Sequence, residues 1–73
     1  MDWAKVIKEI RLTCILSQED FAKELGVSFT TVNRWEKGKS QPSYKAQKLI
    51  DMYCKKNKVD GSIMKELVGE RNV

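Results

Sequence analysis

Residues 16–43 read LSQEDFAKELGVSFTTVNRWEKGKSQPS, two short amphipathic segments that a glycine separates. Ser17 is placed to cap the first segment as a helix, with Asp20 three residues later in the capping-box pattern. Gly26 is expected to end that helix, because glycine readily adopts the left-handed conformation in which many helices end. Ser28 can cap a new helix at once. The stretch therefore predicts two helices joined by a turn of about three residues.

The second of these helices, expected over about residues 29–37, has only two large inward residues, Val32 and Trp35. We expect Trp35 to be a core residue, and Gly38 to stop the helix. The opposite face is expected to carry Ser28, Phe29, Thr30, Asn33 and Arg34. Asparagine and arginine are the side chains that pair in two places with adenine and guanine edges. This face is therefore a candidate DNA-reading surface, although such residues are also common on ordinary solvated helix faces.

Three further helices are expected around this pair. The first covers about residues 3–13, where apolar residues recur at helical spacing. Another begins near Tyr44, after the loop that contains Pro42, and ends in the basic run at 55–58, which suits the negative end of the helix dipole. A short fifth helix is predicted at about 62–69. Its apolar residues follow helical spacing and are Ile63, Met64, Leu67 and Val68.

The composition agrees with one small domain that binds an anionic partner. A chain of 73 residues buries only about 60% of its unfolded surface, so there is little room for a separate active-site cleft. Its net charge of +4 favours an anionic partner, and nucleic acid is the leading candidate. No apolar run is long enough to span a membrane, and the N-terminus does not resemble a signal peptide. We expect a cytoplasmic protein without a membrane partner.

The residues needed for most catalytic and metal sites are missing from the sequence. The chain contains no histidine, and its two cysteines, Cys14 and Cys54, form no CxxC pair. Both cysteines are expected to be reduced, part-buried small hydrophobic residues. No glycine-rich phosphate loop and no nucleophile with a neighbouring histidine is present. The sequence therefore predicts a protein that is not an enzyme and has neither a metal site nor a cofactor.

The motifs LSQ, LGVS and RWE, followed by GK and P, occur in order within residues 16–43. This stretch resembles the helix-turn-helix family of the phage lambda repressor, Cro and the xenobiotic-response-element regulators. The resemblance implies an all-α fold, a compact bundle of about five short helices. It also implies a single DNA-binding domain over residues 1–73, with its helix-turn-helix core at about 17–38. The second helix of that core, about 28–37, would enter the major groove.

By this resemblance, individual side chains acquire roles. The base-contacting positions are Ser28, Phe29, Thr30, Asn33 and Arg34. The phosphate-contacting positions are Ser17, Gln18, Thr31, Lys37, Lys39, Ser40 and Gln41. Arg11 and Glu36 match a pair that forms a buried salt bridge in several relatives. For Arg34, a surface salt bridge or a phosphate contact is the alternative, and Gln18 could instead be an ordinary surface residue.

The sequence departs from the family at two positions. Relatives often have glycine where this chain has Ile15, so a left-handed turn there would be strained and a differently shaped turn is the alternative. Many relatives have a polar residue where this chain has Phe29. An aromatic ring cannot hydrogen-bond a base edge, but it can lie against a thymine methyl group.

The function that the sequence predicts is sequence-specific binding of double-stranded DNA by a small transcription regulator, a repressor. One helix-turn-helix reads only a few base pairs, so a homodimer on a palindromic site is expected. Met64 and its apolar neighbours could join two copies, or could pack on Trp3 and Tyr53 within one copy. The alternative function is a protein-interaction module, such as an antitoxin-like partner.

Overall fold

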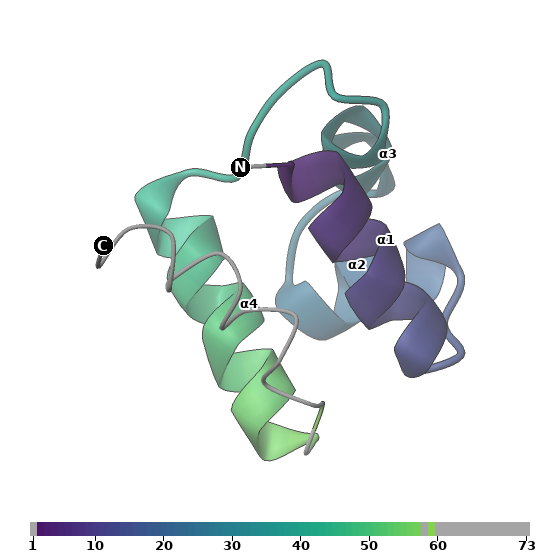
Figure 1. Cartoon of the computed structure of the whole chain (residues 1–73), viewed down its shortest axis with the longest axis vertical. Coiled ribbons are helices and arrows are strands. Elements are labelled where there is room, and N and C mark those ends of the chain that lie inside the picture. Colours follow the sequence, from purple (N-terminus) through teal and green to yellow (C-terminus); the bar gives the residue numbers. More distant parts are fainter. Residues whose placement is uncertain (1, 58, 60–73) are drawn as a thin grey trace.

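The computed structural model describes residues 2–57 and 59, and within them the chain forms four α-helices and no strand. The helices are α1 (Trp3–Thr13), α2 (Gln18–Leu25), α3 (Phe29–Glu36) and α4 (Tyr44–Lys56), as Figure 1 shows. The all-α class is confirmed. The expected number of about five helices is slightly off for the described part of the chain, and the predicted helix at 62–69 lies outside it.

Each helix begins where a polar side chain accepts a hydrogen bond from a backbone N–H of the first turn. Ser17 and Ser28 cap α2 and α3 through bonds of 3.0 and 3.1 Å, as the sequence predicted, and Ser43 caps α4 through a bond of 3.2 Å. Asp2 caps α1 in the same way, by accepting a bond of 3.2 Å from the N–H of Lys5. These caps satisfy backbone donors that have no partner inside the helix, and they set where each helix starts.

All four helices end with the same hydrogen bond, from a backbone N–H to the carbonyl five residues earlier, and in α4 this bond runs from Val59 to Cys54. At the end of α2, the N–H of Val27 donates to the carbonyl of Ala22, and at the end of α3 the N–H of Lys39 donates to the carbonyl of Arg34. Gly26 and Gly38 lie in these two turns with φ of 73° and 72°. Glycine has no Cβ atom that could clash at such angles, so each helix can stop abruptly and the chain can change direction.

The end of α1 makes the same turn without a glycine. The N–H of Leu16 donates to the carbonyl of Arg11, and Ile15 takes the left-handed position with φ of 56°. The sequence left a differently shaped turn open at this point, and the structure instead keeps the left-handed turn. The backbone of Ile15, a β-branched residue, is therefore held in a conformation that such residues normally avoid. The side chain of Ile15 is 90% exposed, so burial of that side chain does not offset the strain.

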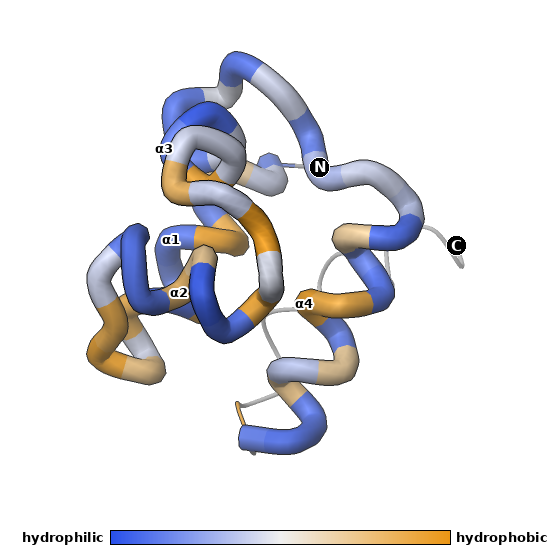
Figure 2. Tube along the Cα trace, turned by 180° about the vertical axis from the view of Figure 1, so that it is seen from behind, coloured by the Kyte–Doolittle hydropathy of each residue, from blue (hydrophilic) through white to orange (hydrophobic). Residues whose placement is uncertain are grey.

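The core is built from one face of every helix. α2 packs against both α3 and α4, and α1 packs against α3. The rings of Phe21 and Tyr53 meet edge to face, with centroids 5.6 Å apart, and so join α2 to α4. Along each helix in Figure 2, hydrophobic and hydrophilic positions alternate every few residues, as one-sided burial requires. The buried apolar residues are Trp3, Val6, Ile7, Ile10, Phe21, Ala22, Leu25, Val32, Trp35, Ala46, Ile50 and Cys54.

The core assignments made from the sequence are mostly confirmed. Val32 and Trp35 are buried, as expected for the inward side of α3. Cys54 is buried and Cys14 is half-buried, and both are free thiols. None of α1 to α4, in the part of the chain that the structure describes, is both long and apolar enough to cross a membrane.

The turn at Ile15 leads to a prediction about stability. Replacing Ile15 by glycine removes a left-handed strain of about 1–2 kcal/mol, partly offset by the greater freedom of glycine in the unfolded chain. We expect a net gain of about 1 kcal/mol, which for a domain of this size raises Tm by about 4–8 °C. The measurement is thermal unfolding followed by circular dichroism.

Ile15→Ala is the matched control, because it removes the exposed side chain but keeps the Cβ atom that causes the strain. Its Tm should stay close to that of the parent. A Tm for Ile15→Gly no higher than that of Ile15→Ala would show that the turn is not strained.

Candidate nucleic-acid interface

The outward face of α3 is polar and open to solvent. Ser28, Thr30 and Arg34 are exposed, and Phe29 is 50% exposed although it is a large apolar residue. Val32 and Trp35 occupy the opposite face, where they anchor the helix in the core. Four of the five predicted base-reading residues are therefore accessible to solvent, either in α3 or at its N-cap.

Asn33, the fifth residue of that predicted set, is placed differently. It is half-buried, and its Nδ2 donates a hydrogen bond of 3.0 Å to Oε1 of Gln18, the first residue of α2. One donor hydrogen of Asn33 is therefore used inside the protein. A base contact for Asn33 stays a prediction, but its most direct partner is a side chain of the neighbouring helix.

The N-terminus of α2 lies beside α3 and carries two predicted phosphate contacts. Gln18 is half-buried through its bond with Asn33, and Ser17 is exposed. The Oγ of Ser17 accepts a bond from the N–H of Asp20, so the hydroxyl hydrogen of Ser17 is free for another acceptor. Thr31, predicted as a phosphate contact on α3, is half-buried, and its hydroxyl lies 2.8 Å from that of Ser28.

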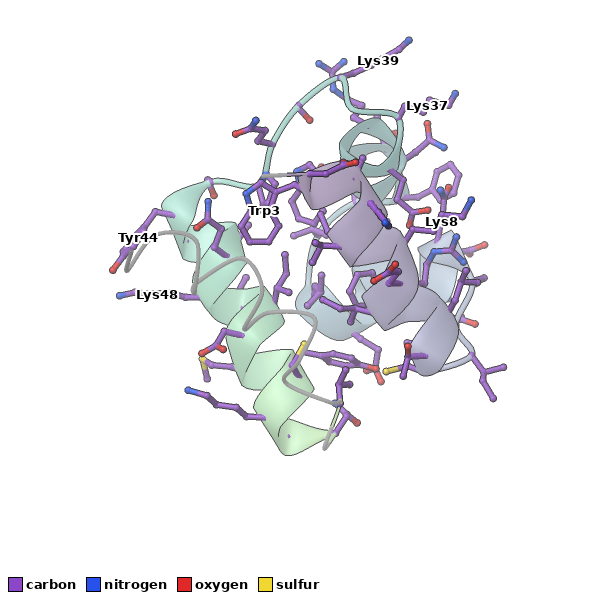
Figure 3. All side chains as sticks on the ribbon, viewed as in Figure 1. Trp3, Lys8, Lys37, Lys39, Tyr44 and Lys48 are labelled. Atoms are coloured by element: carbon purple, nitrogen blue, oxygen red, sulfur yellow. The ribbon has the colours of Figure 1, made fainter. Side chains whose placement is uncertain are left out.

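The loop after α3 extends the polar surface. Lys37 and Lys39 are exposed, and Figure 3 shows both side chains pointing away from the helices at the C-terminal end of α3. Gln41 is exposed and Ser40 is half-buried. The turn at Gly38 brings this loop next to the end of α3, so its two lysines place positive charge at the edge of the candidate reading face.

The side chain of Arg11, in α1, joins the end of α3 to the segment just before α2. Its Nε and Nη2 donate to the two carboxylate oxygens of Glu36 at 2.7 and 2.9 Å, and its Nη1 donates to the carbonyl of Leu16 at 2.9 Å. The two side chains are only 13% and 5% exposed. The hydrogen bond to Glu36 raises the pKa of Arg11, more than burial lowers it, so the guanidinium stays charged. The resemblance implied this pair, and the structure confirms it.

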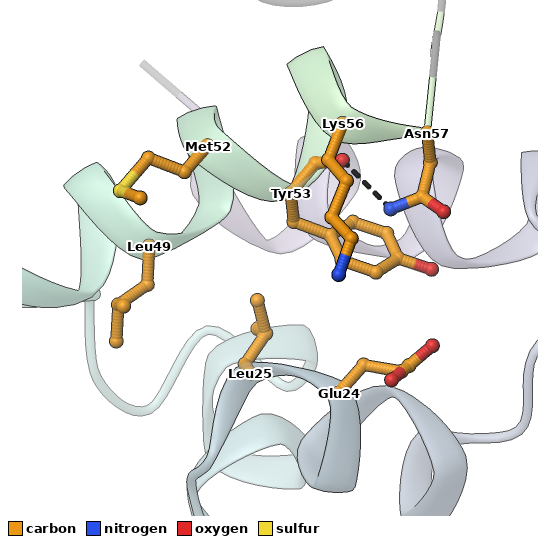
Figure 4. Close-up of a pocket in the computed structure, with 7 residues that line it drawn as sticks. All are labelled: Glu24, Leu25, Leu49, Met52, Tyr53, Lys56 and Asn57. Carbon is orange, nitrogen blue, oxygen red and sulfur yellow. Dashed lines mark hydrogen bonds between the residues drawn. The ribbon is translucent and has the colours of Figure 1, made fainter.

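A separate hollow lies between α2 and α4, away from the candidate DNA contacts (Figure 4). Its volume is about 270 Å³, and it is lined by Glu24, Leu25, Leu49, Met52, Tyr53, Lys56 and Asn57. Burial and a hydrogen bond to Cys14 raise the pKa of Tyr53 to about 12, and burial raises the pKa of Cys54 in the adjacent core to about 11. Both groups are therefore neutral at pH 7, and neither is an activated nucleophile.

Metal ligands do not gather anywhere in residues 2–57 and 59, where no three histidine, cysteine, aspartate or glutamate side chains lie close enough to hold an ion. The polar side chains of α3 and its surroundings are hydrogen-bond donors and acceptors of the kinds that contact base edges and phosphates. The arrangement is thus suited to binding nucleic acid.

Comparison with known proteins agrees with this geometry. A model of the family described as Helix-turn-helix matches residues 7–51, which include most of α1, all of α2 and α3, and most of α4. The chain belongs to this family. No curated protein and no solved structure matches it. The family match confirms the resemblance to the lambda repressor and Cro type. The helix-turn-helix domain is a DNA-binding regulator of transcription, and its family is not a family of enzymes.

Two contacts of the helix-turn-helix were missed by the sequence analysis. One is the bond from Asn33 to Gln18, and the other is the third bond of Arg11, to the carbonyl of Leu16. The first joins residues 15 positions apart and depends on how α2 crosses α3, which no local pattern records. A signal was present only in the residue types, because a glutamine at the start of α2 and an asparagine in α3 can pair through their amides.

The three hydrogen bonds of the Arg11 guanidinium, which we call the Arg11 fork, lead to a prediction about folding. Glu36→Ala leaves a nearly buried guanidinium without its carboxylate, and breaking a buried pair in this way costs about 3–5 kcal/mol. A domain this small has roughly 5 kcal/mol of stability, so the variant should be largely unfolded or should unfold at much lower denaturant. The measurement is the midpoint of a urea titration.

Asp51→Ala is the control, because Asp51 pairs with Lys55 on the exposed side of α4 at 3.0 Å, with the two side chains 46% and 77% exposed. Exposed pairs contribute about 0–1 kcal/mol, so this variant should have nearly the parent midpoint. Equal midpoints for the two variants would mean that the Arg11 fork does not support the fold.

Proposed function

We propose that this helix-turn-helix domain binds double-stranded DNA in a sequence-specific manner and represses transcription in the cytoplasm by occupying its site. The observation that carries the proposal is the division of α3 into two faces. Val32 and Trp35 are buried, whereas Phe29, Thr30 and Arg34 are exposed together on the other side. A helix of this kind fits the major groove, where each base pair presents a distinct set of donors and acceptors.

In this proposal the first turn of α3 and Arg34 contact the bases. Ser28, Phe29 and Thr30 would lie deepest in the groove, because the N-terminal residues of a recognition helix reach the base edges. Phe29 offers an apolar surface to a thymine methyl group, and Arg34 offers two donors to a guanine. The half-site is therefore expected to contain a thymine and a guanine a few base pairs apart.

Phosphate contacts would flank this surface on both sides. In this proposal Ser17, Gln18 and Thr31 contact one stretch of backbone, and the loop after α3 contacts another through Lys37, Lys39, Ser40 and Gln41. Such contacts set the position of the protein on the duplex and carry no sequence information of their own.

We further propose that two copies bind a palindromic site. One recognition helix contacts only a few base pairs, and two of them related by a two-fold axis would reach major-groove faces about 34 Å apart. The segment predicted to join the copies, around Met64, lies outside the described residues. Selection of bound duplexes from a random DNA pool tests the whole proposal, because it should return an inverted repeat. Failure to enrich any sequence would favour the protein-interaction module instead.

The selected site provides the test of Arg34. If Arg34 pairs with a guanine, Arg34→Ala should lose about 1–3 kcal/mol of binding free energy on that site and should relax the preference at one base pair. Binding to random duplex should change much less. Fluorescence anisotropy on both duplexes measures the two affinities. An equal loss on both duplexes would make Arg34 a phosphate contact.

A second prediction concerns the loop. If Lys39 neutralises a phosphate, Lys39→Ala should reduce the slope of log affinity against log salt by about 0.9 and should weaken binding to all sequences alike. Lys55→Ala removes the same charge from the exposed side of α4, where Lys55 pairs with Asp51, and should leave the slope unchanged. A slope that Lys39→Ala does not alter would exclude this loop lysine from the interface.

A further inference from the structure

We propose that Asn33 is a positioning residue, which holds the side-chain amide of Gln18 with its NH₂ group directed outward as a donor to a DNA phosphate. The inference deepens the proposed function and rests on it. Its basis is the bond of 3.0 Å from Nδ2 of Asn33 to Oε1 of Gln18, which joins the middle of α3 to the first residue of α2.

The direction of this hydrogen bond decides what Gln18 can do. A glutamine amide carries an acceptor oxygen and a donor NH₂ group, and a freely rotating side chain presents either one. Phosphate oxygens only accept hydrogen bonds. Because Asn33 donates to the oxygen of Gln18, the NH₂ group is the part left for an external partner. The bond thus selects the orientation of Gln18 that a phosphate requires.

The charges around Gln18 make that orientation important. Glu19 and Asp20 occupy the first turn of α2, where their negative charges interact favourably with the helix dipole but repel a phosphate. Lys23 is the neighbouring cation, but its Nζ lies 3.9 Å from the carboxylate of Glu19, and both side chains are about 70% exposed. A phosphate at this helix end is therefore best bound by neutral donors, and the amide of Gln18 is one that a hydrogen bond from α3 holds in place.

The surrounding structure keeps both partners in register. Arg11 binds the carbonyl of Leu16, two residues before Gln18, and binds Glu36, three residues after Asn33. The same guanidinium thus binds the carbonyl just before α2 and the carboxylate at the end of α3, the two helices that carry the amides. Asn33 is half-buried, in contrast to the exposed Arg34 beside it, as expected for a side chain that supports another rather than one that reads a base.

The test is a double-mutant cycle on the selected DNA site, with Gln18→Ala, Asn33→Ala and the double variant. Loss of one oriented hydrogen bond corresponds to about a threefold to tenfold weaker affinity. We expect Asn33→Ala to fall in that range, and the double variant to bind no more weakly than Gln18→Ala alone. The salt slope should not change in any of them, because no charge is removed. Thermal unfolding of each variant shows that it is folded at the temperature of the binding assay.

Asn33→Asp provides a second variant of nearly the same size. Its carboxylate can only accept, so it would bind the NH₂ group of Gln18 and turn the oxygen outward. The added charge also weakens DNA binding, and the same substitution in the Gln18→Ala background measures that charge effect alone. We expect the loss to be greater when Gln18 is present, because the reversed amide then opposes the phosphate.

The outcomes separate this inference from the proposed function. Additive losses in the cycle would overturn the positioning role. A changed preference at one base pair in Asn33→Ala, persisting without Gln18, would overturn it in favour of a base contact by Asn33. If the parent binds no duplex at all, the proposed function fails and this inference fails with it.

Discussion

The position of the candidate DNA-binding surface depends on the three hydrogen bonds of Arg11. Two of them grip the carboxylate of Glu36 at the end of α3, and the third holds the carbonyl of Leu16 just before α2 begins. A planar guanidinium presents its donors in a rigid fork, so these bonds fix angles as well as distances. The two helices of the helix-turn-helix are therefore held relative to each other by a side chain from a third helix.

Such a fixed contact matters because the hydrophobic core is small. α3 has only eight residues and contributes only Val32 and Trp35 to the core. Non-directional apolar packing of two side chains restrains the rotation of a short helix less than a bidentate ion pair does. The fork at Glu36 lies directly after Trp35, so the core contact and the ion pair act on the same turn. The opposite side of α3 is then left without core contacts.

The abrupt helix ends also determine where α3 and the loop after it lie. The turns at Gly26 and Gly38 let α3 be short and let the chain leave it at once toward the loop that carries Lys39. The turn at Ile15 performs this task before α2, although an isoleucine is poorly suited to the left-handed conformation. That turn also presents the Leu16 carbonyl to Arg11, so the strain is located where the fork needs the backbone.

Local sequence determined the starts of α2, α3 and α4 and the ends of α2 and α3, because serine caps, glycine stops and the restriction before Pro42 act within three or four residues. Helical spacing likewise identified Val32 and Trp35 as core and their neighbours as an exposed face. The motifs LSQ, LGVS and RWE sufficed to indicate the family. The pairing of Arg11 with Glu36 came only from that resemblance, since nothing in the spacing of two residues 25 positions apart predicts a contact.

Only the tertiary structure decided how the polar side chains are used. Asn33 has the same helical environment in sequence as Arg34, yet the crossing of α2 over α3 brings one amide to Gln18 and leaves the arginine in solvent. The left-handed turn at Ile15 was also decided there, because the hydrogen bonds at the end of α1 and the grip of Arg11 outweigh the local preference of the residue. Contacts between helices depend on crossing angles, which are set by packing of the whole core.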